Sequence, residues 1–220
     1  LYLLDLEHIA GDEWEYGQLS AACGQAAFGA IESAIELAMD GNVDAVVTAP
    51  INKEALRLAG IDYAGHTEIF ADKSATRDYA MMLVHDDFRV VHVSTHVSLR
   101  AACDAVTRER VARVIQLAHE ALVRTGIAAP RIAVAGLNPH AGENGLFGRE
   151  EIEQIAPAIQ DARSHGMRVD GPLPPDTVFP RAAAGAYDCV VAMYHDQGHL
   201  PVKMLGFAFG AESDSTAVVH

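Results

Sequence analysis

DAVTRERVARVIQLAHEALVRTGIAAPRIAVAG, residues 104–136, contains the pattern that decides the fold. Its first part carries apolar residues at helical spacing and predicts a helix over Asp104–Thr125, ending before Gly126. Its last part, Arg131–Gly136, is apolar at successive positions, which is typical of a strand buried on both faces of a parallel sheet. A helix followed by a buried strand is a repeating unit of layered α/β proteins.

The same alternation occurs on both sides of this stretch. A helix over Gln18–Met39 precedes the apolar run Val43–Thr48. A helix over Arg149–His165, kinked or restarted at Pro157, precedes the buried run Asp188–Met193. We therefore expect an α/β fold with helices flanking a sheet.

One part of the chain predicts an antiparallel pair. The β-rich runs Tyr79–Val84 and Phe88–Ser94 are separated by only three residues, and so short a connection requires a hairpin. The predicted sheet is therefore mixed.

Composition excludes several classes of protein. The 220 residues are 50% hydrophobic, and 30 acidic against 16 basic residues give a net charge of −14. This acidic excess argues against nucleic-acid binding, and the abundant, periodic aliphatic residues argue against disorder. Since neither a continuous apolar stretch of membrane-spanning length nor a secretory signal is present, we expect a cytoplasmic protein that does not bind membranes. The three cysteines are read as reduced core thiols: Cys23, Cys103 and Cys189.

Polar residues with useful chemistry follow the predicted strands, where open α/β sheets bind ligands. His96, His140 and His195 each follow a different strand. Three neutral imidazoles suit a divalent metal (Zn, Co, Mn or hydrated Mg) with positions left open for substrate, so the trio is a candidate catalytic metal site. The alternative is that they are ordinary hydrogen-bonded loop residues among 11 histidines.

Other segments each allow two interpretations. The loop Gly65–Glu68 either binds an anion through His66 and Thr67 or is a simple helix start with Thr67 as the cap and His66 in solvent. Lys53 and Lys203 are either anion ligands or solvated surface residues.

Two loops also carry candidate roles. Asp176 ends the proline-rich loop 171–177, which is either a support for a functional carboxylate or a structural corner. The glycine-rich stretch 142–148 lacks the spacing of a nucleotide-binding loop and is interpreted as a tight turn that positions Asn138 and His140.

Six motifs together resemble the 4-hydroxythreonine-4-phosphate dehydrogenase family. They are TAPINKEAL (48–56), GHTEIFA (65–71), STHVSLR (94–100), GLNPHAGENGLFGREE (136–151), GPLPPDTVF (171–179) and MYHDQGHLPVKMLGF (193–207). The resemblance implies an NAD-dependent, divalent-metal-dependent oxidation of a secondary alcohol beside a carboxylate, with decarboxylation. It also implies a fold similar to isocitrate and isopropylmalate dehydrogenases.

The resemblance also implies roles for single residues. The family's metal ligands fall on His96, His140 and His195, in a site shared between the two subunits of a homodimer. Its phosphate-binding residues fall on His66, Thr67 and Lys203, and its acidic position in the GPLPxDT loop falls on Asp176, which would transfer a proton or orient the substrate. The role of Lys53 stays open.

Further expectations concern the extent of the chain and its substrate. Family members continue beyond both ends, so we expect residues 1–220 to be the central fragment of a two-domain dehydrogenase, with its NAD-binding residues elsewhere and its subdomain boundary undefined. The resemblance implies a 4-phosphorylated four-carbon 3-hydroxy acid as the substrate. His199, where the vitamin B6 enzymes of the family usually have Leu, looks more like the branch that acts on phosphothreonate or phosphoerythronate than the branch that acts on 4-hydroxythreonine 4-phosphate. The alternatives are a three-histidine metal hydrolase or aldolase, and a non-catalytic fragment.

Overall fold

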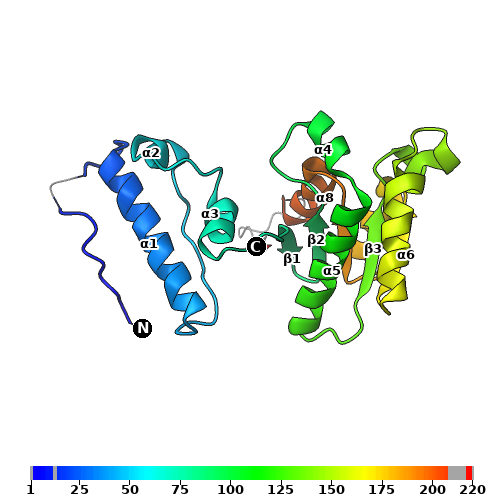
Figure 1. Ribbon diagram of the computed structural model, residues 1–220, viewed down its shortest axis with the longest axis horizontal. Helices are drawn as coiled ribbons and strands as arrows, with labels where there is room; N and C mark the ends of the chain where they lie inside the picture. The colour runs from blue at the N-terminus through cyan, green and yellow to red at the C-terminus, as the bar shows by residue number, and fades with distance from the viewer. Residues whose placement is uncertain (1, 12–13, 208–216, 220) are drawn as a thin grey trace. The chain divides into compact units, whose positions relative to one another are not determined.

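The computed structural model describes residues 2–11, 14–207 and 217–219. The chain divides into two compact units, Leu1–Arg77 and Asp78–His220 (Figure 1). The first unit has one hydrophobic cluster and the second has two among the described residues. We describe each unit by itself.

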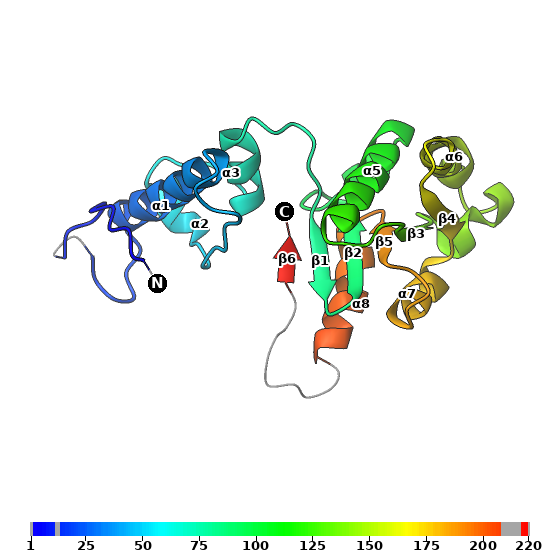
Figure 2. The ribbon, with the colours of Figure 1, turned by 90° about the horizontal axis from the view of Figure 1, so that it is seen from below.

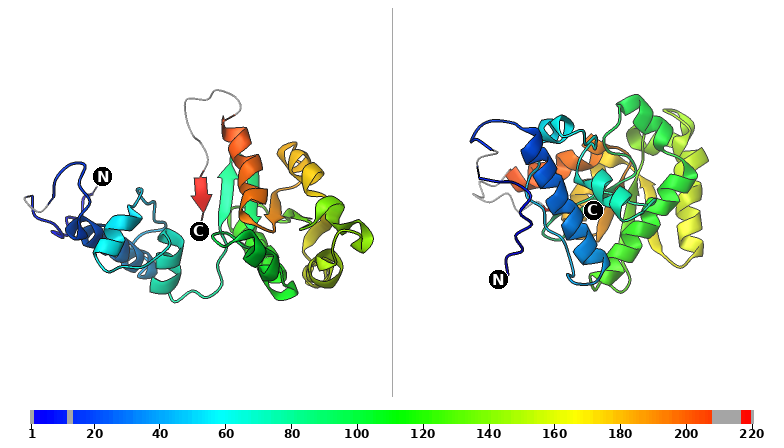
Figure 3. Two further views of the ribbon diagram at one scale, coloured as in Figure 1. Left: turned by 90° about the horizontal axis from the view of Figure 1, so that it is seen from above. Right: turned by 60° about the vertical axis from the view of Figure 1, so that its left-hand side comes forward.

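The first unit is helical in its described residues. It contains α1 (Ala21–Met39), α2 (Lys53–Leu58) and α3 (His66–Lys73), and α1 and α2 lie against each other (Figure 3). Their shared core consists of Phe28, Ile31, Ile35, Leu56 and Ile69. A Cβ at Gly24 would lie 2.0 Å from the Ala55 carbonyl oxygen, so the close approach of these two helices requires glycine there.

The predicted helix in this unit is confirmed, whereas the predicted strand Val43–Thr48 is wrong. That run has no regular structure, and the Val47 side chain is 96% exposed. A strand requires a neighbour for its backbone hydrogen bonds. Within the described residues of this unit every regular element is a helix, so this apolar run has nothing to pair with.

The second unit is built on a six-stranded mixed sheet (Figure 2). The strands are β1 (Met82–His85), β2 (Phe88–His92), β3 (Arg131–Ala135), β4 (Arg168–Leu173), β5 (Cys189–Ala192) and β6 (Ala217–Val219). Their order is β4-β3-β5-β2-β1-β6; the first four are parallel, while β1 is antiparallel to both β2 and β6. The predicted mixed sheet and hairpin are confirmed.

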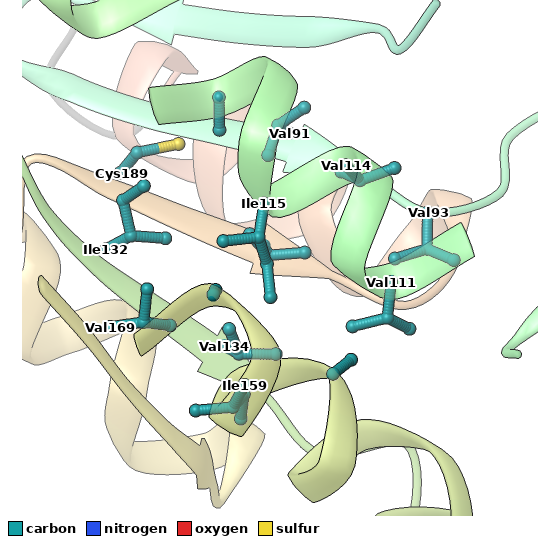
Figure 4. Packing of buried hydrophobic residues seen from close by; sticks show 14 of the residues in the cluster. Val91, Val93, Val111, Val114, Ile115, Ile132, Val134, Ile159, Val169 and Cys189 are labelled. Carbon is teal, nitrogen blue, oxygen red and sulfur yellow. The ribbon is translucent and has the colours of Figure 1, made fainter. Parts of the chain in front are cut away.

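Helices cover both faces of this sheet, as expected for buried parallel strands. On one side lie α5 (Arg108–Arg124) and α6 (Ala156–Ser164), and on the other α7 (Pro175–Ala183) and α8 (His195–Phe207) (Figure 2). Alternate residues of one strand enter the two cores. Ile132 and Val134 of β3 pack with Ile115 and its neighbours on α5 (Figure 4), while Ala133 and Ala135 face α7 and α8.

The predicted helices of this unit need adjustment. Asp104–Thr125 is divided between the short α4 (Leu99–Ala105) and α5, because the Thr107 side chain accepts a hydrogen bond from the Arg110 amide and starts a new helix. The predicted restart at Pro157 is confirmed: the wide turn η2 (Glu151–Ile155) precedes α6 at this point. Proline has no N–H to continue the regular helical ladder.

Several elements were not predicted, among them β4 and α8, and one assignment was wrong. β4 includes Gly171 and Pro172, and as an outer strand it accommodates proline. Helix α8 forms despite Gly198 and Pro201. Cys189 is buried as predicted, but Cys103 on α4 is exposed and therefore not a core thiol.

Candidate active site at the carboxyl edge of the sheet

Four of the predicted site residues follow four neighbouring strands. Because β4, β3, β5 and β2 are parallel, their carboxyl ends meet at one edge of the sheet. In strand order, the residues that follow are Asp176 at the start of α7, His140, His195 at the start of α8, and His96. Asp176, His140 and His96 are exposed and His195 is half-buried, so all four are accessible to a ligand.

His195 lies at the centre of a group of imidazoles. Its ring centroid is 5.9 Å from that of His96, and the His199 ring, one helical turn later, stacks on it at 3.6 Å. The His195 Nδ1 atom is hydrogen-bonded to Asp196 Oδ1 at 2.7 Å. In metal sites a carboxylate commonly holds the second ring nitrogen of a histidine ligand in this way, which leaves Nε2 for the metal.

His140 lies apart from this pair, beside Phe147 at a ring-centroid distance of 6.2 Å. Across residues 2–11, 14–207 and 217–219, no group of three or more His, Cys, Asp or Glu side chains is arranged to hold a metal ion. The three histidines therefore occupy adjacent strand ends without forming a three-ligand set within this chain.

The turn that carries His140 has an uncommon backbone. The tight helical turn η1 (Pro139–Gly145) follows β3, and its five residues from His140 to Asn144 all have positive φ, between 43° and 80°. Four of these are not glycine, and the left-handed helical conformation costs an L-amino acid roughly 1–2 kcal/mol per residue. Such strain persists only where surrounding contacts enforce it, and it is typical of functional sites.

Buried polar side chains join the strand ends that carry the histidines. The Ser94 hydroxyl donates to the Met193 carbonyl at 2.9 Å and so connects the ends of β2 and β5. Gln197 accepts from the Met193 amide at 2.6 Å and donates to the Gly136 carbonyl at 2.8 Å, connecting β5 to β3. The carboxylate of Glu151 accepts from backbone amides just before η1. We call Ser94, Gln197 and Glu151 the polar frame.

The polar frame was missed by the sequence reasoning. Its three members lie inside the quoted motifs, but the identity of a polar residue within a motif gives no sign of whether it faces solvent or the protein interior. The prediction that the glycine-rich stretch forms a close-packed turn agrees with the structure: a Cβ at Gly148 would lie 2.4 Å from Asn138 Nδ2.

The predicted phosphate residues lie on two helices. His66 and Thr67 begin α3, whose N-cap is Gly65, without a side-chain cap; Thr67 is buried. The alternative in which Thr67 caps the helix and His66 is solvated is therefore wrong. Burial lowers the pKa of His66, and its Nε2 atom is buried without a hydrogen-bond partner among the described residues.

The two lysines differ in their surroundings. Lys203 is half-buried on α8, two turns after His195, so that the positions of His195, His199 and Lys203 follow one another at four-residue spacing along the helix. Lys53 is exposed at the start of α2.

In the described part of the chain, no helix is both long enough and apolar enough to cross a bilayer.

Comparison with known proteins gives the family. A family model described as pyridoxal phosphate biosynthetic protein PdxA matches residues 1–215. The D-threonate 4-phosphate dehydrogenase of Salmonella typhimurium is 53% identical over 210 residues, which are 96% of this chain and 64% of that protein. Thus the chain spans less than two thirds of the length of this relative.

Solved structures agree with the fold. The crystal structure of a 4-hydroxythreonine-4-phosphate dehydrogenase from Klebsiella pneumoniae has a TM-score of 0.84 and 52% identity, covering 90% of this chain and 60% of that one. A 4-hydroxythreonine-4-phosphate dehydrogenase from Burkholderia phymatum has a TM-score of 0.82 and 50% identity, covering 93% and 62%. On the family match, these identities and this fold, the chain belongs to the PdxA family.

Proposed function

We propose that this chain is part of an NAD-dependent, divalent-metal-dependent dehydrogenase that oxidises and decarboxylates a 4-phosphorylated four-carbon 3-hydroxy acid. The observation that carries the proposal is the row of Asp176, His140, His195 and His96 at four neighbouring strand ends in a PdxA-family chain. Open α/β sheets bind their ligands at this edge.

The histidines fit a divalent metal by their donor chemistry. Asp196 is hydrogen-bonded to the Nδ1 atom of His195, which would leave Nε2 for a metal, and the His96 ring lies nearby. His140 would supply the third imidazole. Since one chain does not bring all three together, we further propose that two copies form a homodimer in which each subunit contributes ligands to a shared site.

The chemistry of the reaction divides between the bound groups and the chain's own residues. When bound, the divalent ion would acidify the substrate hydroxyl and NAD would accept the hydride. The chain's residues would orient the substrate. Asp176, exposed at the same edge, is proposed to take up the hydroxyl proton or to fix the position of that hydroxyl.

Phosphate recognition is proposed for residues in each unit. At the start of α3, the Thr67 side chain and the His66 Nε2 atom, which is buried without a hydrogen-bond partner among the described residues, suit an anionic oxygen. In the second unit, Lys203 on α8 is proposed by itself as a phosphate ligand, since it is a positive charge in a chain of net charge −14.

The preferred substrate is D-threonate 4-phosphate or its erythronate counterpart. Two features support this choice over 4-hydroxythreonine 4-phosphate: the name of the 53% identical relative, and His199, which stacks directly on His195.

A cytoplasmic location is also proposed, supported by three cysteines that are free in the structure.

Formation of NADH tests this function. The complete natural protein carrying this sequence is incubated with NAD and Co²⁺, Mn²⁺, Zn²⁺ or Mg²⁺, and with each of the two candidate substrates in separate reactions. The proposal expects a rise in NADH absorbance and release of CO₂, faster with D-threonate 4-phosphate. Phosphate release or carbon–carbon cleavage without NADH would instead identify a hydrolase or an aldolase, and no turnover with any metal would leave a non-catalytic binding protein.

A further inference from the structure

We infer that Glu151 is a positioning residue: its buried carboxylate holds the left-handed turn η1 and thereby sets the orientation of His140. This inference rests on the proposed function, because the purpose of orienting His140 is to present its imidazole to a divalent ion. Glu151 itself does not face that ion. It acts through the backbone that carries the ligand.

The contacts of Glu151 all lead to the start of the turn. Its Oε1 atom accepts hydrogen bonds from the amides of Leu137 at 2.8 Å and Asn138 at 2.7 Å. Its Oε2 atom accepts from Asn138 Nδ2 at 2.9 Å. The residue is only 3% exposed, so water does not replace these bonds readily. A carboxylate buried among three N–H donors fixes two successive peptide groups immediately before Pro139 and His140.

The turn is packed onto this carboxylate as well as hydrogen-bonded beside it. A Cβ at Gly142 would lie 2.6 Å from Glu151 Oε2, and one at Gly136 would lie 3.1 Å from Oε1. The glycines on either side of His140 therefore allow the backbone to close around Glu151. Since four non-glycine residues of η1 have positive φ, the conformation needs such an enforcing contact.

Glutamine is the informative replacement. Glu151→Gln keeps the shape and one oxygen that can accept from the two backbone amides. Its NH₂ group, however, then meets the NH₂ group of Asn138, so a donor faces a donor where an acceptor is required. The expected result is a turn that still forms but is less firmly held.

The control lies two residues further along the chain. Glu153 is exposed and pairs with Arg149. Glu153→Gln removes the same charge from the same segment without touching the turn, so it separates the loss of a local negative charge from the loss of positioning.

The experiment uses Co²⁺ as the probe in the complete protein. Titration measures the affinity for Co²⁺, and the visible absorption of bound Co²⁺ reports its ligand geometry. Amide hydrogen exchange over residues 137–145 measures how rigidly the backbone of the turn is held. We expect Glu151→Gln to weaken Co²⁺ binding about 10-fold or more, to change the absorption spectrum, and to speed exchange, while Glu153→Gln changes none of them. If Glu151→Gln does not fold, Asn138→Ala, which keeps the carboxylate but removes one of its donors, is expected to show the same three changes.

The outcomes separate this inference from the proposed function. Loss of thermal stability with unchanged Co²⁺ affinity and spectrum would mean that Glu151 is merely structural and would overturn the inference. If the wild-type protein binds no Co²⁺, the metal proposal and the ligand-orienting purpose fail together. Hydrogen exchange over residues 137–145 then still reports whether Glu151 holds the turn. If Glu151→Gln speeds this exchange although no Co²⁺ binds, the metal proposal is wrong while the structural role of Glu151 stands.

Discussion

Replacing Gln197 with Met should destabilise the second unit by removing the link between β5 and β3. Met is similar in size but cannot donate a hydrogen bond, and its sulfur is only a weak acceptor. It would leave the Met193 amide and the Gly136 carbonyl without their present partners, at 2.6 and 2.8 Å. Each buried polar group left unsatisfied costs about 1–3 kcal/mol, so the expected loss is about 2–6 kcal/mol. The lower value applies if a water molecule enters beside the Met side chain and forms hydrogen bonds with the Met193 amide and the Gly136 carbonyl.

Urea unfolding followed by circular dichroism measures this loss, and hydrogen exchange at the Met193 amide locates it. Gln116→Met is the matched control, because Gln116 is exposed on α5 and donates a hydrogen bond to Glu120 one turn away. Such surface pairs contribute about 0.2–0.5 kcal/mol. The reasoning is refuted if the two variants are equally stable, or if exchange at Met193 is the same as in the wild-type protein.

Three further results are expected. Ile115→Ala, at a fully buried α5 position between the helix and the sheet, should lower the free energy of unfolding by about 2–5 kcal/mol in urea titrations. Arg131, which hydrogen-bonds Asp188, holds the pKa of that carboxyl below its usual range. Asp188 therefore stabilises the fold above about pH 4, and this contribution is lost as the pH falls through its lowered native pKa; Asp188→Asn should flatten the acid side of the curve of unfolding midpoint against pH. His140→Ala should abolish stoichiometric Co²⁺ binding, measured by titration.

Each of these has a control. Val123→Ala, at a 42% exposed position of α5, should leave stability nearly unchanged, and a loss equal to that of Ile115→Ala would contradict the burial argument. An acid limb as steep in Asp188→Asn as in the wild type would exclude the carboxyl as its source. His165→Ala removes an exposed histidine beyond α6 and should retain Co²⁺; equal retention by His140→Ala would exclude His140 as a ligand.

The sheet of the second unit could be predicted because its strands carry their own signal. Arg131–Gly136 and Asp188–Met193 consist largely of successive apolar residues, and only a strand covered on both faces requires that pattern. Val43–Thr48 has the same pattern but forms no strand. A strand needs a second strand to pair with, and the composition of the segment does not show whether one is present. β4 could not be predicted because it contains Pro172, and proline normally argues against a strand. The sequence does not reveal that β4 lies at the edge of the sheet, where proline is tolerated.

The candidate site could be predicted only as far as topology determines it. The parallel order brings the strand ends of His96, His140 and His195 to one edge, and the rule for open α/β sheets anticipates this. The left-handed conformation of η1 could not be foreseen, since Ala141 and Glu143 are residues that normally avoid positive φ. The contacts that enforce it come from Glu151, whose burial follows from tertiary packing.

The strand order also affects how the second unit can assemble during synthesis. β5 lies in the middle of the sheet, between β3 and β2, yet it leaves the ribosome after both of them. β2 pairs with β5 across about a hundred residues of chain, and such distant pairings make folding slow. Until Ala192 has been synthesised, β2 and β3 each have an edge without its native neighbour. We therefore expect the nascent chain to be prone to mispairing late in translation, and the insertion of β5 to be the step that joins two half-sheets into one.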